Sequence, residues 1–324
     1  MAKNLSSHRK IIVILGPTAS GKSDLAVKIA LRLNSKQTKR IRGISGAEVI
    51  SADSRQVYKG MDIGSGKITK KEMKGVPHHL LGVVSPKKTF TAAQFQKMAK
   101  KAVEKILKGK KVPIVCGGTG LYIDALIYNY QFPKIPPQAE LRKKLEKFPT
   151  EKLFEQLTNL DPKRAKNIDR HNRRRLIRAI EIAKNLGRVP ELKKYSDYEV
   201  LKIGIKKSPG ELEKLIEERL KKRLKIGMVK EVERLRDGSG LNPAGKPSAS
   251  YGLNWKRLDG FGLEYRFISR YLRGLITKKE MEESIIKEGR HYAKRQMTWF
   301  KKDKRINWVD NAKAATKLVE TFLK

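Results

Sequence analysis

The chain is poor in cysteine and in long apolar runs. Cys116 is its one cysteine, so no disulfide can form within a molecule. No run approaches the ~20 apolar residues that span a membrane. The first ten residues, MAKNLSSHRK, also lack the charged, apolar and small-residue order of a secretory signal. These absences predict a cytoplasmic protein without a membrane partner.

Acidic residues are scarce as well. The 324 residues include 33 Asp and Glu against 74 Lys and Arg, which gives a formal net charge of +41. Such a surplus favours a polyanion as partner, because each phosphate that is neutralised releases condensed counterions, and nucleic acid is the leading candidate. A lysine-rich surface that is merely solvated is the alternative. A hydrophobic fraction of 39% is high enough for a folded core.

Short apolar runs alternate with helical patterns along much of the chain. Apolar runs at Ile11–Leu15, Ala47–Ala52 and Val112–Cys116 read as strands, and Asp24–Leu33 has helical spacing. The strand pattern returns at Tyr198–Ile205 and Ile306–Val309. Two long helical patterns, Pro209–Arg236 and Lys278–Lys302, lie between these strands. This βα alternation predicts an α/β fold with a parallel sheet.

The middle of the chain interrupts that alternation. Three short basic helices are expected between Pro133 and Pro190, namely Leu141–Phe148, Glu151–Leu160 and Arg173–Leu186. We therefore expect residues 131–190 to form an all-helical insertion in a discontinuous core made of residues 1–130 and 191–324. The stretch Pro243–Gly262 is rich in Gly, Pro and Ser and is expected to be a loop.

A phosphate-binding motif follows the first strand. It matches GxxxxGK[ST] with Gly16, Pro17, Thr18, Ala19, Ser20, Gly21, Lys22 and Ser23. Its glycines let backbone amides turn toward a phosphate, its lysine neutralises oxygens, and the hydroxyl of Ser23 can ligate Mg²⁺. The motif predicts a P-loop NTPase-like core, but kinases, ATPases and GTPases share it.

A second motif indicates the family. Residues 51–64 read SADSRQVYKGMDIG, which closely resembles the D-S-x-Q-V-Y-x-G-M-D-I-G signature of tRNA dimethylallyltransferases, also called tRNA isopentenyltransferases. The resemblance continues in family order at residues 77–81, 90–95, 117–122, 178–181 and 293–300. It implies transfer of a dimethylallyl group from dimethylallyl pyrophosphate to the N6 amine of the adenosine 3′-adjacent to the anticodon. One cysteine cannot supply the zinc finger of many eukaryotic relatives, which favours the bacterial type.

The chemistry implied by the resemblance needs a base and fixed cations. An exocyclic amine is a weak nucleophile, so a group must accept its proton as the new bond forms, and Asp53 is the candidate. Its alternative role is that of a turn aspartate. The leaving pyrophosphate gains charge, which Thr18, Lys22, Mg²⁺ on Ser23 and Arg219 are expected to meet. The alternative for Arg219 is a solvated basic helix face.

Further residues are assigned to tRNA by the resemblance or by their charge. Near the target base these are Asp53, Ser54, Arg55, Gln56 and Thr119, followed later in the chain by Arg142, Arg174, Arg175, Arg178, Tyr265 and Arg266. Arg173 adds a fourth guanidinium to the helix of Arg174, Arg175 and Arg178, and a solvated charged helix is the alternative. Aromatic residues at helical spacing, Tyr122, Trp299 and Phe300, are expected in the core. His78 and His79 are expected to pack or hydrogen-bond.

Two further functions remain open from the residues alone. A P-loop small-molecule kinase, or an enzyme that prenylates free adenine nucleotides, would explain residues 16–23 and Mg²⁺. A non-catalytic RNA-binding ATPase would explain the charge. The family resemblance instead predicts a monomeric enzyme whose partners are the tRNA anticodon stem-loop and dimethylallyl pyrophosphate, with no protein partner.

Overall fold

The protein divides into two compact parts. The computed structural model describes residues 9–35, 43–192, 194–237 and 251–324. One part, which we call the sheet unit, comprises Met1–Asn129 and Ser196–Lys324, and the other, the helical unit, is Tyr130–Tyr195. The helical unit thus interrupts the sheet unit in sequence over residues 130–195, where the expected insertion was 131–190.

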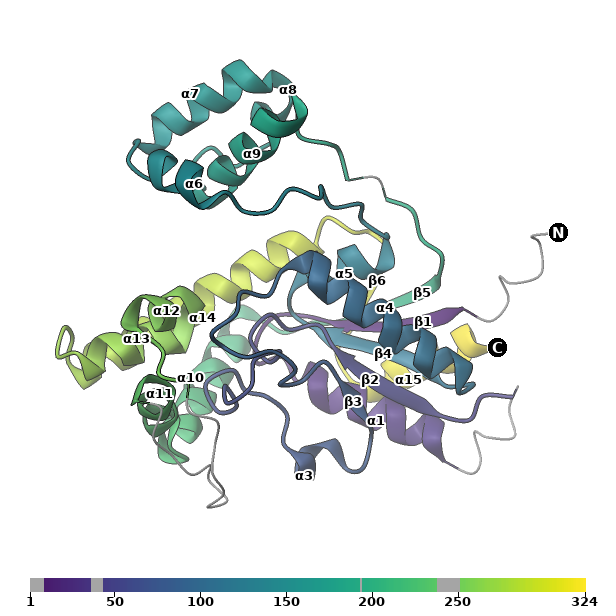
Figure 1. The fold of residues 1–324 in the computed structure, drawn as a ribbon. Helices are drawn as coiled ribbons and strands as arrows, with labels where there is room; N and C mark the ends of the chain where they lie inside the picture. Colours follow the sequence, from purple (N-terminus) through teal and green to yellow (C-terminus); the bar gives the residue numbers. More distant parts are fainter. Residues whose placement is uncertain (1–8, 36–42, 193, 238–250) are drawn as a thin grey trace. The chain divides into compact units, whose positions relative to one another are not determined.

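Parallel strands form the centre of the sheet unit (Figure 1). The strands are β1 (Lys10–Leu15), β2 (Ala47–Ser51), β3 (His78–His79), β4 (Val112–Gly117), β5 (Glu199–Ile205) and β6 (Ile306–Val309). Their order across the sheet is β3-β2-β4-β1-β5-β6, and every pairing is parallel. The expected α/β class with a parallel sheet is confirmed. The pattern missed β3, because two residues are too few to show a period.

Helices cover both faces of this sheet (Figure 1). Buried residues of α1 (Lys22–Asn34) and α15 (Ala312–Leu323) share one apolar cluster with strands β1, β2, β4 and β5. Of two further helices, α4 (Ala92–Lys108) contacts strands β2 and β4, and α5 (Gly120–Ile127) contacts β4. The continuous apolar strands of the sequence thus reflect burial on both faces.

A second apolar cluster lies among the later helices. These are α10 (Pro209–Lys225), α11 (Met228–Asp237), α12 (Trp255–Phe261), α13 (Leu263–Leu272) and α14 (Lys278–Phe300), and their cluster includes Val57, Tyr58 and Met61 from the loop after β2. A short helix, α3 (Lys70–Met73), follows that loop. Capping boxes at Ser208 and Thr277 fix where α10 and α14 begin.

Two expectations about this region were wrong. The single helix expected over 209–236 is two helices, because Gly227 adopts φ +98° and ends the helical path after Lys225. The loop expected at 243–262 contains α12, which begins where Asn254 caps it by accepting from the Arg257 amide. Residues 243–250 lie outside the described residues.

The helical unit has its own core. It contains α6 (Ala139–Leu145), α7 (Thr150–Leu160), α8 (Pro162–Ala165) and α9 (Arg173–Leu186). Buried leucines and isoleucines of α7 and α9, among them Leu153, Leu157 and Ile180, form the centre of that core. Within the residues that the structure describes, no helix of either unit is long and apolar enough to cross a membrane.

Candidate active site

The loop between β1 and α1 has the backbone of an anion site. Ala19 and Gly21 both adopt positive φ, +63° and +84°, so the chain turns sharply before α1 begins at Lys22. A concave run of backbone amides at a helix N-terminus favours bound phosphate through partial positive charge. The hydroxyl of Ser20 is buried and has no hydrogen-bond partner among the described residues. A buried hydroxyl of this kind needs a partner, and a phosphate oxygen or water at the loop would supply one.

Two side chains at this loop bear on charge. The ammonium Nζ of Lys22 donates to the Pro17 carbonyl at 2.9 Å, so it lies across the loop. Burial lowers the pKa of Lys22, whereas Cys116 and Asp53 nearby oppose that shift. The Cys116 thiol donates to the Lys22 carbonyl at 3.5 Å, and burial raises its pKa to about 11. The thiol therefore stays neutral beside the phosphate loop.

Arg219 of α10 reaches the same loop from far along the sequence. Its Nη2 donates to the Thr18 hydroxyl at 2.6 Å. Burial and the neighbouring Arg223 lower the pKa of Arg219 to about 10, so the guanidinium is still charged at neutral pH. The structure thus brings together Thr18, Lys22 and Arg219, which the sequence could only place in separate segments.

Gln296 of α14 joins the phosphate loop to the loop after β4. Its Oε1 accepts from the Thr18 amide at 2.8 Å, and its Nε2 donates to the Gly118 carbonyl at 2.8 Å. A Cβ on Gly118 would lie 2.1 Å from that Nε2, so only glycine permits this approach. Both hydrogen-bonding ends of the buried amide are satisfied, and the two loops are held in one arrangement.

Asp53 lies just past the end of β2, beside these loops. In the sheet Ser51 pairs with Cys116 and Leu15 with Gly117, so the ends of β1, β2 and β4 lie at one edge. The Oδ1 atom of Asp53 accepts from the amides of Arg55 at 2.8 Å and Gln56 at 3.3 Å, which is an Asx turn. No hydrogen bond among the described residues reaches its Oδ2. One oxygen therefore forms the turn, and the other is available to accept a hydrogen bond or a proton.

The charge of Asp53 acts on the cations around it. Its carboxylate raises the pKa of Lys22 and of Arg219 against the stronger lowering by burial. No ion pair at bonding distance is formed between Asp53 and a cation of the described residues. Asp53, Lys22 and Arg219 are thus close enough to interact electrostatically and remain separate.

Thr119 lies opposite Asp53 at the end of β4. Its Oγ1 accepts from the Ser54 amide at 3.1 Å. The threonine hydroxyl thus connects the end of β4 with the turn of Asp53. Burial and the charge of Asp53 raise the pKa of Tyr292 on α14.

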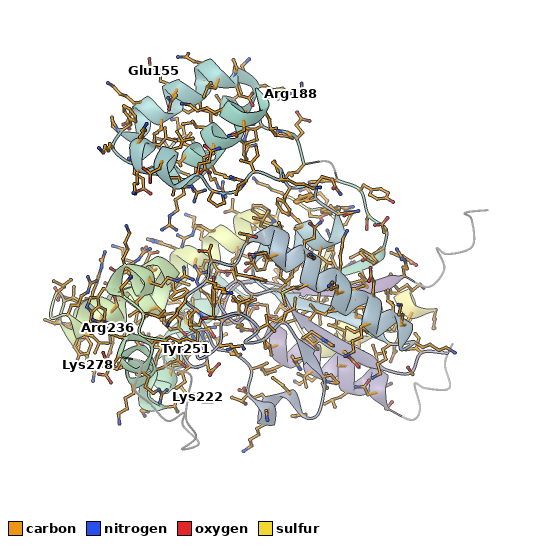
Figure 2. The ribbon with its side chains drawn as sticks, in the orientation of Figure 1. Glu155, Arg188, Lys222, Arg236, Tyr251 and Lys278 are labelled. Carbon is orange, nitrogen blue, oxygen red and sulfur yellow. The ribbon has the colours of Figure 1, made fainter. Side chains whose placement is uncertain are left out.

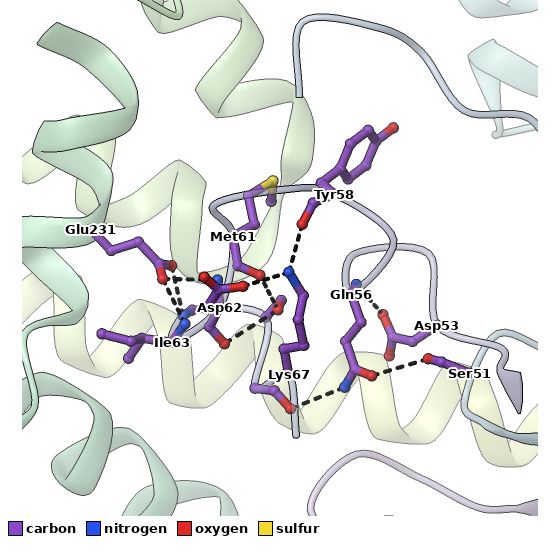
Figure 3. Close-up of polar contacts among 12 residues, drawn as sticks. Ser51, Asp53, Gln56, Tyr58, Met61, Asp62, Ile63, Lys67 and Glu231 are labelled. Carbon is purple, nitrogen blue, oxygen red and sulfur yellow. Dashed lines mark hydrogen bonds and ion pairs between the residues drawn. The ribbon is translucent and has the colours of Figure 1, made fainter. Parts of the chain in front are cut away.

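The loop after Asp53 is held by polar contacts (Figure 3). Gln56 accepts from the Ser51 hydroxyl at 3.1 Å and donates to the Gly66 carbonyl at 3.0 Å. Farther on, the buried carboxylate of Glu231 accepts from the amides of Asp62, Ile63 and Gly64 at 2.6–3.0 Å. Gln56 and Glu231 thus fix both ends of this loop in place.

The residues expected near the target base and at the late tRNA contact differ in exposure. Arg55 Nε donates to the Phe261 carbonyl at 2.6 Å, and Arg266 Nε donates to the Asp259 carbonyl at 3.2 Å. Tyr265 is 1% exposed and donates to Glu231 Oε1 at 2.9 Å. The expected tRNA contact of Tyr265 is therefore not supported, because its whole side chain belongs to the core.

The expected arginine group of the helical unit separates into two kinds. Arg142 donates to both oxygens of Glu181 at 2.7 Å, and Arg178 donates to Glu181 at 3.2 Å. Glu181 itself is fully buried. Arg174 and Arg175 are exposed, like Arg188 in the side-chain view (Figure 2). Arg142 and Arg178 thus hold the unit together, and Arg174 and Arg175 remain open to a partner.

The aromatic residues behave largely as expected. Tyr122 is buried and stacks on Phe95 with ring centroids 4.2 Å apart, and Phe300 is buried as well. Trp299 is partly exposed and donates from Nε1 to Asp124 at 3.0 Å. A Cβ on Gly120 would lie 2.3 Å from the Trp299 ring. The prediction of core aromatics is confirmed for Tyr122 and Phe300, and Trp299 packs at the edge of the core.

The two histidines do hydrogen-bond, as expected. His79 Nε2 lies 2.7 Å from Glu48 Oε2, and His78 Nδ1 lies 2.8 Å from the Val76 carbonyl. Burial lowers the pKa of His78. Both residues therefore belong to the edge of the sheet at β3.

Comparison with known proteins identifies the family of this chain. The model of the family described as IPP transferase matches residues 56–303. The chain belongs to the IPP transferase family. A tRNA dimethylallyltransferase of Anoxybacillus flavithermus is 37% identical over 306 residues, which cover 93% of this chain and 90% of the relative. The tRNA dimethylallyltransferase of Caldanaerobacter subterraneus subsp. tengcongensis is 37% identical and covers 97% of this chain and 96% of its own length.

Solved structures of the IPP transferase family share the fold. The crystal structure of the full-length tRNA isopentenylpyrophosphate transferase from Bacillus halodurans superposes with a TM-score of 0.68 at 32% identity and covers 97% of each chain. The tRNA isopentenylpyrophosphate transferase from Staphylococcus epidermidis gives 0.65 at 32% identity. The resemblance on which the sequence analysis relied is thus confirmed.

Sequence reasoning missed several residues of this IPP transferase site. Gln296 lies inside the matching block 293–300, so the family signal was present, but nothing in a sequence shows what an amide contacts. Tyr292 lies one residue before that block. Glu231 lies in the first turn of α11, an amphipathic helix, where a glutamate is normally solvated. All three residues are defined by burial and tertiary contacts, which leave no local pattern in the sequence.

Proposed function

We propose that this IPP transferase moves a dimethylallyl group from dimethylallyl pyrophosphate to the N6 amine of the adenosine 3′-adjacent to the anticodon of tRNA. One observation carries the proposal. At one edge of the sheet, the phosphate loop, with Arg219 hydrogen-bonded to its Thr18, and Asp53 follow the ends of neighbouring strands, and one oxygen of Asp53 accepts no hydrogen bond from the described residues. An anion-binding end and a proton-accepting end side by side suit an alkyl transfer from a pyrophosphate ester to an amine.

The substrates and these side chains account for every bond and proton of the reaction. The N6 nitrogen forms a bond to the first carbon of the dimethylallyl group while the bond from that carbon to the pyrophosphate oxygen breaks. The electron pair of the breaking bond leaves with the pyrophosphate, and Asp53 accepts the proton that the amine loses. Lys22, Arg219 and the loop amides meet charge that grows on the leaving oxygen, so they stabilise the transition state more than the bound substrate.

A magnesium ion fits the phosphate loop as an accompaniment of the substrate. Mg²⁺ usually keeps several waters and takes one or two protein oxygens together with substrate phosphates. The Ser23 hydroxyl at the start of α1 can supply such an oxygen, and within the described ranges no cluster of three acidic, His or Cys side chains competes as a metal site. Bound there, the ion would neutralise charge on the pyrophosphate.

The helical unit is proposed to hold the tRNA. Its exposed Arg174 and Arg175 suit phosphate contacts, which fix position without reading sequence. Near Asp53, the partly buried Ser54, Arg55, Gln56 and Thr119 suit contacts to the loop that carries the target base. The base must leave its stack to meet the carbon in the site. Because all these residues come from one chain, the enzyme is proposed to act as a monomer.

Transfer of label decides between this proposal and its alternatives. The protein is incubated with isotope-labelled dimethylallyl pyrophosphate, Mg²⁺ and an anticodon stem-loop RNA, with AMP and ATP as parallel acceptors. We expect label in the RNA, dependence on Mg²⁺, and no requirement for ATP, because Lys22 and Ser23 hold a leaving group and not a phosphoryl donor. Transfer to AMP alone, or a strict need for ATP, contradicts the proposal. Mass spectrometry of nuclease digests locates the modified adenosine.

A further inference from the structure

The Gln296 amide reaches the two ends of the site from a helix that is itself fixed nearby. Three residues later on α14, Trp299 Nε1 donates to Asp124 of α5 at 3.0 Å. The indole lies so close to Gly120 that a Cβ on that glycine would come within 2.3 Å of the ring. Residues three apart on a helix lie on one face. The Trp299 contacts therefore fix where α14 presents the buried Gln296.

One end of the Gln296 amide orients a peptide unit of the phosphate loop. Gln296 Oε1 accepts from the Thr18 N–H at 2.8 Å. In a planar trans peptide unit the C=O points opposite to the N–H. The carbonyl of this unit, that of Pro17, accepts from the Lys22 ammonium at 2.9 Å. Gln296 thus sets the peptide plane to which the Lys22 ammonium is bound.

The other end of the amide orients a second peptide unit in the same way. Gln296 Nε2 donates to the Gly118 carbonyl at 2.8 Å. The N–H of this unit, that of Thr119, donates to the Ala52 carbonyl at 3.2 Å. That carbonyl belongs to the peptide unit that leads into Asp53. A single side chain is therefore linked, through one peptide unit on each side, to the cation of the phosphate loop and to the backbone that carries Asp53.

We propose that Gln296 is a positioning residue that sets Lys22 and Asp53 in the relative geometry that dimethylallyl transfer needs. The inference rests on the proposed function, in which Lys22 stabilises the leaving pyrophosphate and Asp53 accepts the proton of the amine. These two groups act on one transition state, so their placement relative to each other governs the rate of bond formation. Each substrate binds mainly at one end of the site. Loss of Gln296 should therefore slow transfer and leave both substrates bound.

The first test is Gln296→Met, which keeps the length of the side chain and removes both hydrogen bonds. Single-turnover transfer from saturating dimethylallyl pyrophosphate to a saturating anticodon stem-loop should fall ~10²-fold, the cost of a misplacement of about 1 Å. The KM for dimethylallyl pyrophosphate and the Kd of the stem-loop should stay near their wild-type values. A wild-type transfer rate, or a loss confined to KM or Kd, overturns the inference.

A double variant separates positioning from packing. If Gln296 acts by placing Lys22 relative to Asp53, removal of the base removes most of what Gln296 contributes. Gln296→Met should then slow the Asp53→Asn enzyme only about tenfold, because residues of one network are coupled and their effects do not add. Equal losses in the wild-type and Asp53→Asn backgrounds would show a general packing effect and overturn the inference.

Two further variants control for damage to the fold. Gln96→Met removes a hydrogen bond to the Ala125 carbonyl, which joins α4 to α5 outside the site, and should transfer at the wild-type rate. Gln296→Asn keeps the donor and the acceptor on an arm one methylene shorter, so it cannot span both loops and should be slowed like Gln296→Met; it decides the test if the methionine variant does not fold. A wild-type rate in Gln296→Asn overturns the inference alone. If the wild-type enzyme transfers nothing to the stem-loop, the proposed function fails, and the inference fails with it.

Discussion

Two buried or half-buried carboxylates in this protein have opposite surroundings. In the sheet unit, Asp53 has one oxygen in its own turn and, among the described residues, no hydrogen bond to the other. In the helical unit, Glu181 is saturated by Arg142, Arg178 and the Gln138 amide. Burial raises the pKa of Glu181, but these hydrogen bonds outweigh burial and lower it.

The difference shows how basic residues are used in each unit. Arg142 and Arg178 are fastened to a carboxylate and add little free charge at the surface of the helical unit. Lys22 donates to a carbonyl and Arg219 to a hydroxyl, and neither forms an ion pair with a carboxylate of the described residues. A sequence count treats all these cations alike. Pairing with a carboxylate therefore separates the arginines that stabilise the helical unit from the cations of the candidate active site.

The largest expected effect comes from removing the open carboxylate. Asp53→Asn keeps the acceptor of the Asx turn and removes the base. General bases contribute ~10²–10⁴-fold, so turnover should fall by about that factor while tRNA binding changes little, because the carboxylate acts mainly in the transition state. Single-turnover transfer at saturating stem-loop, beside a binding titration, measures both.

A matched control for this change is Asp310→Asn. Asp310 is an exposed aspartate after β6, and the same isosteric change there should leave transfer intact. Near-normal transfer by Asp53→Asn would show that another group accepts the proton and would reduce Asp53 to a turn residue.

The saturated carboxylate should govern stability instead of rate. Glu181→Gln leaves Arg142 and Arg178 without their charged partner, and a lost charged hydrogen-bond network of this kind costs ~1–3 kcal/mol. The side chains of Arg142 and Arg178 are 37% and 33% exposed, so water replaces part of the loss. Hydrogen exchange of the full chain should show faster opening in residues 130–195 and unchanged protection in β1 and β4. Uniform destabilisation of both units would contradict a local role.

Lowering the pH should test the contrast between Glu181 and Asp53 without a mutation. The pKa of Glu181 is lower in the folded protein than in the unfolded chain. Its carboxylate therefore stabilises the fold fully above the ordinary pKa range of glutamate, and this stabilisation is lost as the pH falls through the folded-state pKa. The helical unit should therefore lose protection as pH falls below ~4.3 in the wild type, and the Glu181→Gln variant should lack this component.

The smallest effect is expected at the exposed arginines. Replacing Arg174 and Arg175 by alanine should weaken tRNA binding and make the slope of log K against log salt shallower by about one to two, since each phosphate contact contributes ~0.9 or less. Lys313 and Lys317, exposed on α15, supply the control, because their double alanine variant removes the same charge. Equal slopes for the two double variants would remove the helical unit from the RNA contact.

Sequence predicted the parts of this molecule that rest on periodicity. Strands β1 and β4 are nearly continuous apolar runs because both of their faces are covered, and the phosphate loop is a local motif with a local backbone. The break at Gly227 was missed, since the helical spacing continues across it. The burial of Tyr265 was missed too, because its environment depends on Glu231, a residue 34 positions away. The role of Arg142 depended in the same way on Glu181.

The Gln296 contact has a consequence for how the protein is made. The Thr18 amide of the phosphate loop finds its partner 278 residues later in the chain. Chains emerge at ~5–20 residues per second, so the loop exists for many seconds without that bond. Until α14 has been synthesised, the phosphate loop of a nascent chain therefore lacks its hydrogen bond to Gln296. The hydrogen bond between Thr18 and Gln296 thus forms only after α14 has been synthesised, although the motif of the phosphate loop is itself local.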